Sequence, residues 1–507
     1  MASHVIVLDF GAQYNQLIAR RVREAEIFSE VLPGDTPAAT IRDKGADAVI
    51  LSGGPASVFE PGAPTMDPAV FELGIPVLGI CYGMQLMAHL LGGRVIPAAR
   101  QEYGRSRMTI QRMVPLLEGL SSPSTVWMSH GDIVESAPPG FQVLASTPTT
   151  PIAAMGDPAR NLWAVQYHPE VHHTPEGQRL IENFLYRVAG LRPDWRPAEV
   201  IDQAVAQIRA EVGEGRALIA LSGGVDSAVA GALAARAIGD RLTAVLIDHG
   251  LMRADEVDEI RSVFADQIDL HIVDASEQFF AALAGVTDPE AKRKIIGREF
   301  IRAFEATEQA LGPREVLIQG TVYPDVIESG GGQARTIKSH HNVGGLPEDM
   351  RFRVVEPLRW LFKDEVRRIG TALGLPDRLV WRHPFPGPGL AVRIIGEVTR
   401  EKVAIVRAAD AIVRQEIDRA GLNRQVWQAF AVLLDIRAVG VMGDQRTYGY
   451  PLVVRAVESL DGMTADWVRL PPEVLDAIAN RVVGEVPAVN RVVYDITSKP
   501  PGTIEWE

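Results

Sequence analysis

Residues 218–228 have the sequence LIALSGGVDSA, which leaves the backbone few conformations to choose from. The four apolar residues at its start predict a buried strand, the two glycines predict a tight turn, and Asp226 with Ser227 predicts the first turn of a helix. Such a turn directs several backbone N–H groups and the positive end of a helix dipole toward one point, where a polyphosphate can bind. The segment therefore predicts a nucleotide-binding turn at the end of a strand.

Two interpretations of this turn stay open on the residues alone. The glycines either cradle phosphates or only permit close packing, with Asp226 or Ser227 capping the helix. No Gly-Lys-Ser/Thr follows, so the turn is not a Walker P-loop. If phosphates bind here, the Asp226 carboxylate would repel them unless a divalent cation lay between the two, so we expect Mg²⁺ at Asp226.

The string SGGVDS resembles the pyrophosphate loop of the N-type ATP pyrophosphatases. Members of that family cleave ATP between its α and β phosphates and adenylate an oxygen that a nucleophile then displaces. The resemblance implies ATP as a co-substrate. It also implies that Lys363, which would otherwise be interpreted as a helix-surface residue, contacts the pyrophosphate. The residues assigned in this way are Ser222, Gly223, Gly224, Val225, Asp226, Ser227, Ala228 and Lys363.

The composition is that of a large chain with well-filled cores. Its 507 residues, 47% of them hydrophobic, are enough for about three domains. The net charge of −13 argues against a broad nucleic-acid or anionic-membrane surface, so the expected partners are small molecules. No apolar run is long enough to span a membrane, and the N-terminal residues lack the features of a signal peptide, so we expect a cytoplasmic protein.

Cys81 is the single cysteine of the chain, which excludes an intrachain disulfide and a multi-cysteine zinc site. It lies in GICYG, between two glycines, after an apolar segment and before a helical one. Small neighbours permit the strained elbow that exposes a nucleophile, and a helix N-terminus favours the thiolate. A lone cysteine is more often a buried core residue, but the G-x-C-x-G context favours the nucleophile.

A thiolate nucleophile needs a base and an acid that orients the base, and WAVQYHPE supplies His168 and Glu170 after an apolar strand. Side chains two positions apart in an extended segment point to the same side, so imidazole and carboxylate can be adjacent. The backbone N–H groups of Gly53, Gly54 and Tyr82 are candidates for an oxyanion hole. We therefore predict a catalytic triad of Cys81, His168 and Glu170.

These motifs together resemble the class I glutamine amidotransferase domain over residues 4–190. Three apolar segments, VIVLDFGAQ, DAVILSGGP and IPVLGICYG, each end in a glycine turn and predict a parallel α/β sheet with its functional loops at the strand carboxyl ends. The resemblance implies that Gln85 contacts the substrate glutamine and that residues 129–132 (SHGD) line its pocket.

Proline-rich stretches suggest the domain boundaries. The linker GLRPDWRPAEV, residues 190–200, and the segment RHPFPGPGL, residues 382–390, both interrupt regular structure. We predict two parallel-sheet α/β domains, 1–192 and 193–382, followed by a small α+β domain, 383–507. In the second domain a strand ends at Asp248 and His249, at the sheet edge where the adenosine should bind.

Two further segments of the second domain invite functional interpretations. The basic cluster from Lys292 to Arg302 is either a solvated helix face or a lid over phosphates. Residues 328–347, which contain Gly330 to Gln333, His340 and His341, are too glycine-rich for a core and fit a mobile substrate loop; adjacent histidines alone do not predict zinc.

The order of all these motifs, ending in HPFPGPGL and DITSKPPGTIEWE, resembles the glutamine-hydrolysing GMP synthetase family across essentially the whole chain. The resemblance implies that ATP and Mg²⁺ adenylate xanthosine monophosphate (XMP), that ammonia from glutamine displaces AMP to give GMP, and that the protein is a homodimer. It also implies XMP contacts for Lys499 and Glu505. The patterned C-terminus suggests a segment docked on another surface, such as a second subunit.

Three alternative functions compete with this interpretation. A ligase with the same loop could adenylate another acceptor. A tRNA-thiolase-like enzyme would need a basic RNA surface and a sulfur-relaying cysteine near the loop, and the acidic composition and the position of Cys81 oppose it. A non-catalytic glutamine sensor would have no need of both a nucleophile elbow and a polyphosphate cradle.

Overall fold

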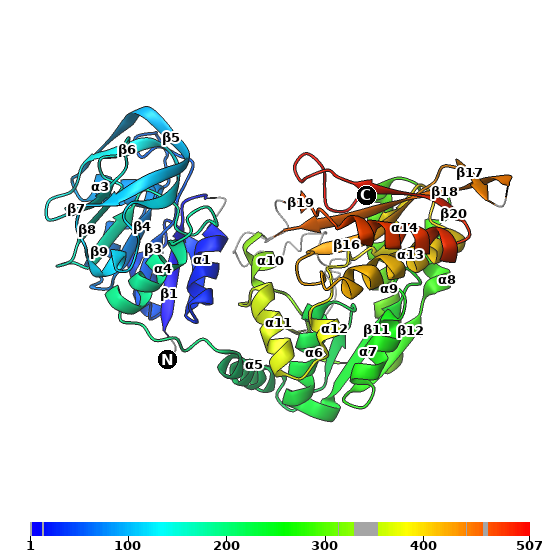
Figure 1. Cartoon of the computed structure of the whole chain (residues 1–507). Helices are drawn as coiled ribbons and strands as arrows, with labels where there is room; N and C mark the ends of the chain where they lie inside the picture. The colour runs from blue at the N-terminus through cyan, green and yellow to red at the C-terminus, as the bar shows by residue number, and fades with distance from the viewer. Residues whose placement is uncertain (1–2, 13–14, 313, 329–352, 443, 460–464) are drawn as a thin grey trace. The chain divides into compact units, whose positions relative to one another are not determined.

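A computed structural model describes residues 3–12, 15–312, 314–328, 353–442, 444–459 and 465–507. The chain divides into two compact units, Met1–Val200 and Ile201–Glu507 (Figure 1). The predicted substrate loop, with Gly330 to Gln333, His340 and His341, lies outside the described residues apart from its first position. In the described ranges, no helix combines the length and the apolar character needed to cross a membrane.

The first unit is built on one mixed sheet, whose described strands run in the order β2-β1-β3-β4-β9-β8-β7-β5-β6. The first five of these pair in parallel, as the three glycine-ended apolar segments predicted, and the other four pair antiparallel, which was not predicted. The strands are β1 (His4–Asp9), β2 (Phe28–Pro33), β3 (Ala48–Leu51), β4 (Val77–Ile80), β5 (Arg94–Ile110), β6 (Ser124–Ser136), β7 (Gln142–Ser146), β8 (Ala154–Asp157) and β9 (Leu162–Val165).

Short helices cover this sheet and connect its strands. The central strands β3 and β4 are buried on both faces, because helices on each side remove their apolar side chains from water. The helices are α1 (Asn15–Glu24), α2 (Ala38–Asp43), η1 (Pro68–Glu72), α3 (Tyr82–Leu90), η2 (Pro115–Leu117), α4 (Gly177–Glu182) and η3 (Asn183–Val188).

The second unit begins with a parallel sheet in the order β12-β11-β10-β13-β14, in agreement with the predicted parallel α/β architecture. Its strands are β10 (Ala217–Ala220), β11 (Leu242–Asp248), β12 (Asp269–Asp274), β13 (Val316–Ile318) and β14 (Arg353–Val355). Its helices are α5 (Pro197–Val212), α6 (Val225–Ile238), η4 (Gly239–Arg241), α7 (Glu256–Phe264), α8 (Ser276–Leu283), α9 (Pro289–Leu311), α10 (Tyr323–Glu328), α11 (Lys363–Ala372) and α12 (Asp377–Val380).

A second, mostly antiparallel sheet completes this unit, as expected for an α+β segment. Its central strand β18 pairs with β16, β17, β19 and β20. Val406, Ala409, Val413 and Ile417 recur at helical spacing, which favours a helix; they lie in α13, and all four side chains are buried. The elements are η5 (Gly389–Arg393), β15 (Ile394–Ile395), α13 (Arg400–Arg419), β16 (Gln428–Leu434), β17 (Ala438–Met442), β18 (Gln445–Glu458), β19 (Asp466–Trp467), α14 (Pro472–Glu485) and β20 (Val489–Asp495).

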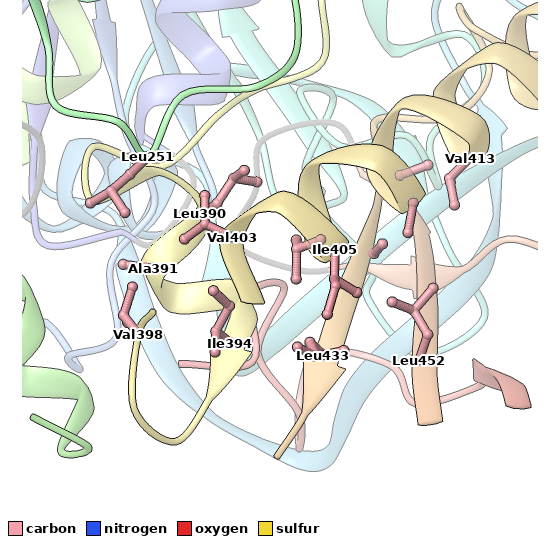
Figure 2. Packing of buried hydrophobic residues seen from close by; sticks show 14 of the residues in the cluster. Leu251, Leu390, Ala391, Ile394, Val398, Val403, Ile405, Val413, Leu433 and Leu452 are labelled. Atoms are coloured by element: carbon pink, nitrogen blue, oxygen red, sulfur yellow. The ribbon is translucent and has the colours of Figure 1, made fainter. Parts of the chain in front are cut away.

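One hydrophobic core joins the two sheets of the second unit. Figure 2 shows Leu251, which follows β11, beside Leu390 of η5, with Ile405 of α13 and Leu433 of β16 further along the same cluster. Leu218 of β10 belongs to it as well. The predicted boundary at residue 382 therefore crosses a continuous core, and the division into three domains stays a prediction.

Two buried histidines make this unit sensitive to acid. Burial lowers the pKa of His249 and of His383 to about 4, because both rings are removed from water. His383 Nδ1 accepts from the Ala429 N–H and Nε2 faces the Asn423 carbonyl, so the neutral tautomer satisfies both contacts. The unfolded chain binds protons at these rings below pH ~6.5, whereas the folded chain does not until pH ~4.

We therefore expect the second unit to lose stability as the pH falls from about 6.5 toward 4. At pH 5 the loss is about 2 kcal/mol for each of these two histidines. Urea unfolding followed at pH 7.5 and at pH 5.0 measures it, and His383→Gln, which keeps one acceptor and one donor, should lose about half of the pH dependence assigned to the pair. An identical pH dependence in this variant would contradict the assignment.

Candidate functional site

Cys81 forms a strained elbow between β4 and α3. Its backbone has φ +52°, a conformation that costs a non-glycine residue of order 1–3 kcal/mol. A Cβ on Gly79 would lie 2.8 Å from the Gly83 carbonyl carbon, and a Cβ on Gly83 would lie 2.5 Å from the Leu51 oxygen. Both glycines of G-x-C-x-G are therefore required by close packing, as the elbow prediction implied.

The thiol, the imidazole and the carboxylate of the predicted triad lie together. His168 Nδ1 is 2.7 Å from Glu170 Oε1, and the Cys81 sulfur lies close enough to the imidazole to raise its pKa. All three residues are buried. Burial alone would lower the pKa of His168, yet the Glu170 carboxylate and the Cys81 sulfur hold it well above its usual value. The arrangement therefore favours an imidazolium beside the sulfur.

The Leu-Ser-Gly-Gly turn lies against this triad. A Cβ on Gly53 would be 3.1 Å from His168 Cε1 and 3.7 Å from Cys81 Cβ. The Gly83 N–H donates to the Ser52 carbonyl (3.0 Å), which ties the turn to the elbow helix. Tyr82 is the first residue of α3, where a backbone N–H has no partner within its own helix.

Gln166, which no sequence motif singled out, contacts the Cys81 sulfur directly. Its Nε2 lies 3.8 Å from Cys81 Sγ, and Gln85 Nε2 donates to Gln166 Oε1 (3.4 Å) and to the Asp132 carbonyl (2.9 Å). The side-chain NH₂ group of Gln85, which was predicted to contact the substrate glutamine, is thus hydrogen-bonded to other groups of the protein. The signal for Gln166 was available, since it lies two positions before His168 in the same extended segment.

The residues around the SHGD segment border the same site. The Cys81 thiol faces the Ser129 carbonyl at 3.7 Å. His130 is buried, which lowers its pKa, and its Nε2 lies 3.7 Å from a Glu102 oxygen. These contacts put the segment beside the Cys81 sulfur.

The SGGVDS turn connects β10 to α6, as predicted. The Ser227 hydroxyl stabilises the turn from within. Its Oγ accepts a hydrogen bond from the Ser222 backbone N–H (3.2 Å) and donates one to the Gly224 carbonyl (3.0 Å). Gly223 has φ +78°, a conformation that glycine adopts without strain. The first N–H groups of α6, from Val225 onward, have no intrahelical partners and are available to an anion.

Asp226 points toward two basic side chains of α11. Its Oδ2 lies 3.3 Å from Lys363 Nζ. Burial lowers the pKa of Arg367, and the nearby Asp226 carboxylate opposes this shift. Oδ1 of Asp226 is buried without a hydrogen-bond partner. Within the described ranges no cluster of three His, Cys, Asp or Glu residues could hold a metal. One carboxylate with a free oxygen does fit Mg²⁺, which commonly binds one or two carboxylates together with substrate phosphates.

The C-terminal segment docks on its own unit. Lys292 is fully buried, forms an ion pair with Glu507 and donates to the Ile394 carbonyl (2.7 Å). This lysine of the basic cluster therefore anchors the C-terminus, so the lid interpretation does not hold for it. Glu505 accepts two bonds from Arg393 and one from Gln428, while the Lys499 backbone pairs with Ala465.

Comparisons with known proteins match three separate parts of the chain. Residues 6–188 match the model for glutamine amidotransferase class-I, residues 198–299 match that for NAD synthase, and residues 415–506 match that for the GMP synthase C terminal domain. A GMP synthase [glutamine-hydrolyzing] from Carboxydothermus hydrogenoformans is 58% identical over 100% of both chains. The chain belongs to the glutamine-hydrolysing GMP synthase family.

Other members of the GMP synthase family align over nearly their whole length. The relative from Parafrankia sp. is 60% identical, covering 99% of this chain and 96% of its own, and that from Symbiobacterium thermophilum is 58% identical over 99% of each. A solved glutamine amidotransferase from Thermotoga maritima covers 37% of this chain and 99% of its own, with 17% identity and a TM-score of 0.30. The predicted resemblance to the GMP synthase family is confirmed.

The Gly53 contact yields a steric prediction for glutamine hydrolysis. In Gly53→Ala the new methyl group meets His168 at 3.1 Å, so the imidazole must move relative to the thiol. We expect kcat/KM for glutamine hydrolysis to fall about 100-fold or more, as for other losses of acid–base alignment. Gly484→Ala, whose Cβ has no neighbour within 4 Å, is the matched control. Wild-type hydrolysis in Gly53→Ala would contradict the predicted role of the imidazole.

Proposed function

We propose that this protein catalyses the glutamine-dependent amination of XMP to GMP through an adenylated XMP intermediate, with ATP cleaved to AMP and pyrophosphate. One observation carries the proposal: a chain of this family presents a buried Cys-His-Glu constellation on one sheet and an SGGVDS phosphate turn on another. The reaction is that of a ligase that forms a C–N bond with glutamine as the amide donor.

In the first step the Cys81 sulfur attacks the amide carbon of glutamine. The oxyanion that forms would be stabilised by the N–H groups of Gly53, Gly54 and Tyr82, which surround the elbow. His168, held by Glu170, donates its proton to the leaving ammonia. Water then hydrolyses the thioester with His168 as the base, which releases glutamate and restores the thiol.

In the second step an oxygen of XMP attacks the α phosphorus of ATP and pyrophosphate leaves. The turn from Ser222 to Ala228 would hold that pyrophosphate through backbone N–H groups, and Lys363 would add a positive charge. Mg²⁺, which Asp226 would hold, supplies charge neutralisation for the phosphates. Ammonia from the first site then attacks the XMP carbon that bears the adenylated oxygen, the bond between this carbon and that oxygen breaks, and AMP leaves with the oxygen as GMP forms.

We assign the XMP contacts to the C-terminal segment. Glu505 has both carboxylate oxygens in contact with Arg393, and its remaining lone pairs can accept from a base N–H or a ribose hydroxyl. Lys499 lies in the same segment and suits a phosphate. The buried anchors Lys292 and Arg455 support this assignment, because they hold residues 497–507 in a defined position.

We propose that the protein is a cytoplasmic homodimer that binds neither nucleic acid nor membranes. The second sheet of unit Ile201–Glu507 supports the dimer, because several large apolar side chains on β17, β18 and β20 and nearby are exposed. Exposed apolar groups of this kind are typical of subunit contacts. They are Ile436, Val439, Val441, Tyr448, Val493 and Ile496.

Removing the thiol should separate the two steps. With XMP, ATP and Mg²⁺, we expect the wild-type protein to form GMP from glutamine and from ammonium. Cys81→Ala should form GMP from ammonium alone, with the glutamine-dependent rate reduced about 10³-fold or more because the covalent step is lost. GMP formation measured by chromatography with each nitrogen donor tests both statements.

The outcomes of this experiment distinguish the alternatives. Glutamine-dependent GMP formation in Cys81→Ala would contradict the role of the thiol. No GMP from either donor in a folded wild-type protein would point to a different adenylated acceptor, while leaving glutamine hydrolysis intact. Wild-type and variant proteins that were equally inactive toward glutamine under all ligand conditions would favour a glutamine sensor.

The role of Asp226 is tested by the Mg²⁺ requirement for nucleotide binding. We expect Asp226→Asn to raise the Mg²⁺ concentration for half-maximal binding of an ATP analogue with an α,β-methylene bridge about tenfold or more, because a carboxylate ligand is lost. Lys363→Met removes the ion-pair partner but keeps the carboxylate, so it should weaken analogue binding without moving the Mg²⁺ midpoint. An unchanged midpoint in Asp226→Asn, measured by titration calorimetry, would contradict the metal assignment.

A further inference from the structure

Asp410 of α13 is a fully buried carboxylate to which neither reaction step above assigns a role. Its Oδ1 accepts from Arg393 Nη1 (3.1 Å) and its Oδ2 accepts from Arg414 Nε (2.9 Å). Oδ2 also lies 3.6 Å from Arg253 Nε. Burial would raise the pKa of this carboxyl, but the three arginines hold it below its usual value, so it stays ionised.

From Asp410, one branch of contacts reaches the C-terminal segment. The Arg393 guanidinium donates to both Glu505 oxygens, from Nε (3.1 Å) and from Nη2 (2.9 Å), and lies over the Phe430 ring with its carbon 4.1 Å from the centroid. Gln428 Nε2 donates to Glu505 Oε1 (2.6 Å). Two donors in a planar fork fix the orientation of the carboxylate as well as its position.

The other branch reaches the SGGVDS turn through residues 382–393, here named the junction segment. Arg253 donates to the His383 carbonyl (3.1 Å) and to the Pro384 carbonyl (3.2 Å) of this segment. The backbone N–H of Arg253 donates to Glu256 Oε2 (3.1 Å), and the other carboxylate oxygen of Glu256 accepts from the Arg382 side chain. Arg382 also donates to the carbonyl of Gly223, in the phosphate turn.

The two branches form one continuous set of contacts from the SGGVDS turn to Glu505, with Asp410 at the point where they meet. Its centre, Asp410 with Arg253 and Arg393, is buried, whereas Arg382 and Glu505 at its ends are partly exposed. Because the central groups are desolvated, moving one of these two arginines would leave Asp410 without one of its partners. The two ends of the network therefore have few independent positions. The junction segment is held at both of its ends, by Arg382 on one side and Arg393 on the other.

We propose that Asp410 is a positioning residue that couples the geometry of the phosphate turn to that of the C-terminal segment. The inference rests on the proposed function, in which the turn binds ATP and the segment binds XMP. Its chemical consequence is that binding of one nucleotide orders the network and strengthens binding of the other. Asp410 touches neither nucleotide in this scheme.

The experiment measures the ratio of two dissociation constants for protein whose folded state is first verified by circular dichroism, because a reversibly unfolded fraction would itself raise the apparent Kd in the absence of XMP. The Kd of the α,β-methylene ATP analogue is determined by titration calorimetry with Mg²⁺, in the absence and in the presence of saturating XMP. In the full-length wild-type protein, XMP should lower this Kd roughly fivefold or more. In Asp410→Asn the ratio should fall below about twofold, while each nucleotide alone still binds.

Three further variants guard against a trivial loss of folding. Asp410→Asn combined with Arg414→Gln removes one negative and one positive charge, so the net charge of the cluster is unchanged, and Arg414→Gln alone is its control. Glu416→Gln changes another buried carboxylate of α13, which pairs with Arg419 and Arg481. The double variant should lose the coupling, whereas Arg414→Gln and Glu416→Gln should keep it.

The outcomes separate failure of this inference from failure of the proposed function. Wild-type coupling in Asp410→Asn or in the double variant would overturn the inference, as would two nucleotides that bind the wild-type protein independently. If the wild-type protein bound neither XMP nor the ATP analogue, the proposed function itself would fail. An equal loss of coupling in Glu416→Gln would show that any disturbance of α13 has this effect, and it would also overturn the specific role of Asp410.

Discussion

Both candidate sites depend on the close approach of backbones at the carboxyl ends of parallel strands. At the elbow, Gly83 packs so tightly on Leu51 that any side chain would overlap its carbonyl, and the nucleophile adopts φ +52° as a result. At the phosphate turn, Gly320 after β13 packs in the same way against the Asp226 backbone. The sheet thus determines where a strand ends, and the absence of a Cβ determines how sharply the chain can turn there.

The triad combines this strain with a buried charge pair. Glu170 raises the pKa of His168 against the effect of burial, and the elbow presents the sulfur to the same imidazole. The energetic cost of the strained residue is small compared with the stability available from a well-filled core, so the fold can support it. A thiol held beside such an imidazole suits acyl transfer better than a structural role.

The second unit solves a different problem, because it buries several charges between its two sheets. The hydrophobic cluster in Figure 2 removes this junction from water. Within it, Asp410, Arg393 and Glu505 satisfy one another, which a buried ion requires. Such a network contributes little net stability but restricts the arrangement of its members. That restriction explains why an acidic C-terminus can lie in one defined position.

Local features were predictable from the order of residues. A strand, a glycine turn and a helix follow one another within residues 218–228, and His168 with Glu170 lie two positions apart on one extended segment, so the period of the backbone makes them neighbours. Features that join distant segments depend on packing. The motifs predicted that Cys81 and His168 belong to one triad, but only the fold brings them together. The contact of Gln166 with the sulfur and the pairing of Lys292 with Glu507 were not predicted. The sequence does not show whether a charged side chain faces water or an oppositely charged partner. The tertiary structure determines this, because a charge that is buried needs a partner.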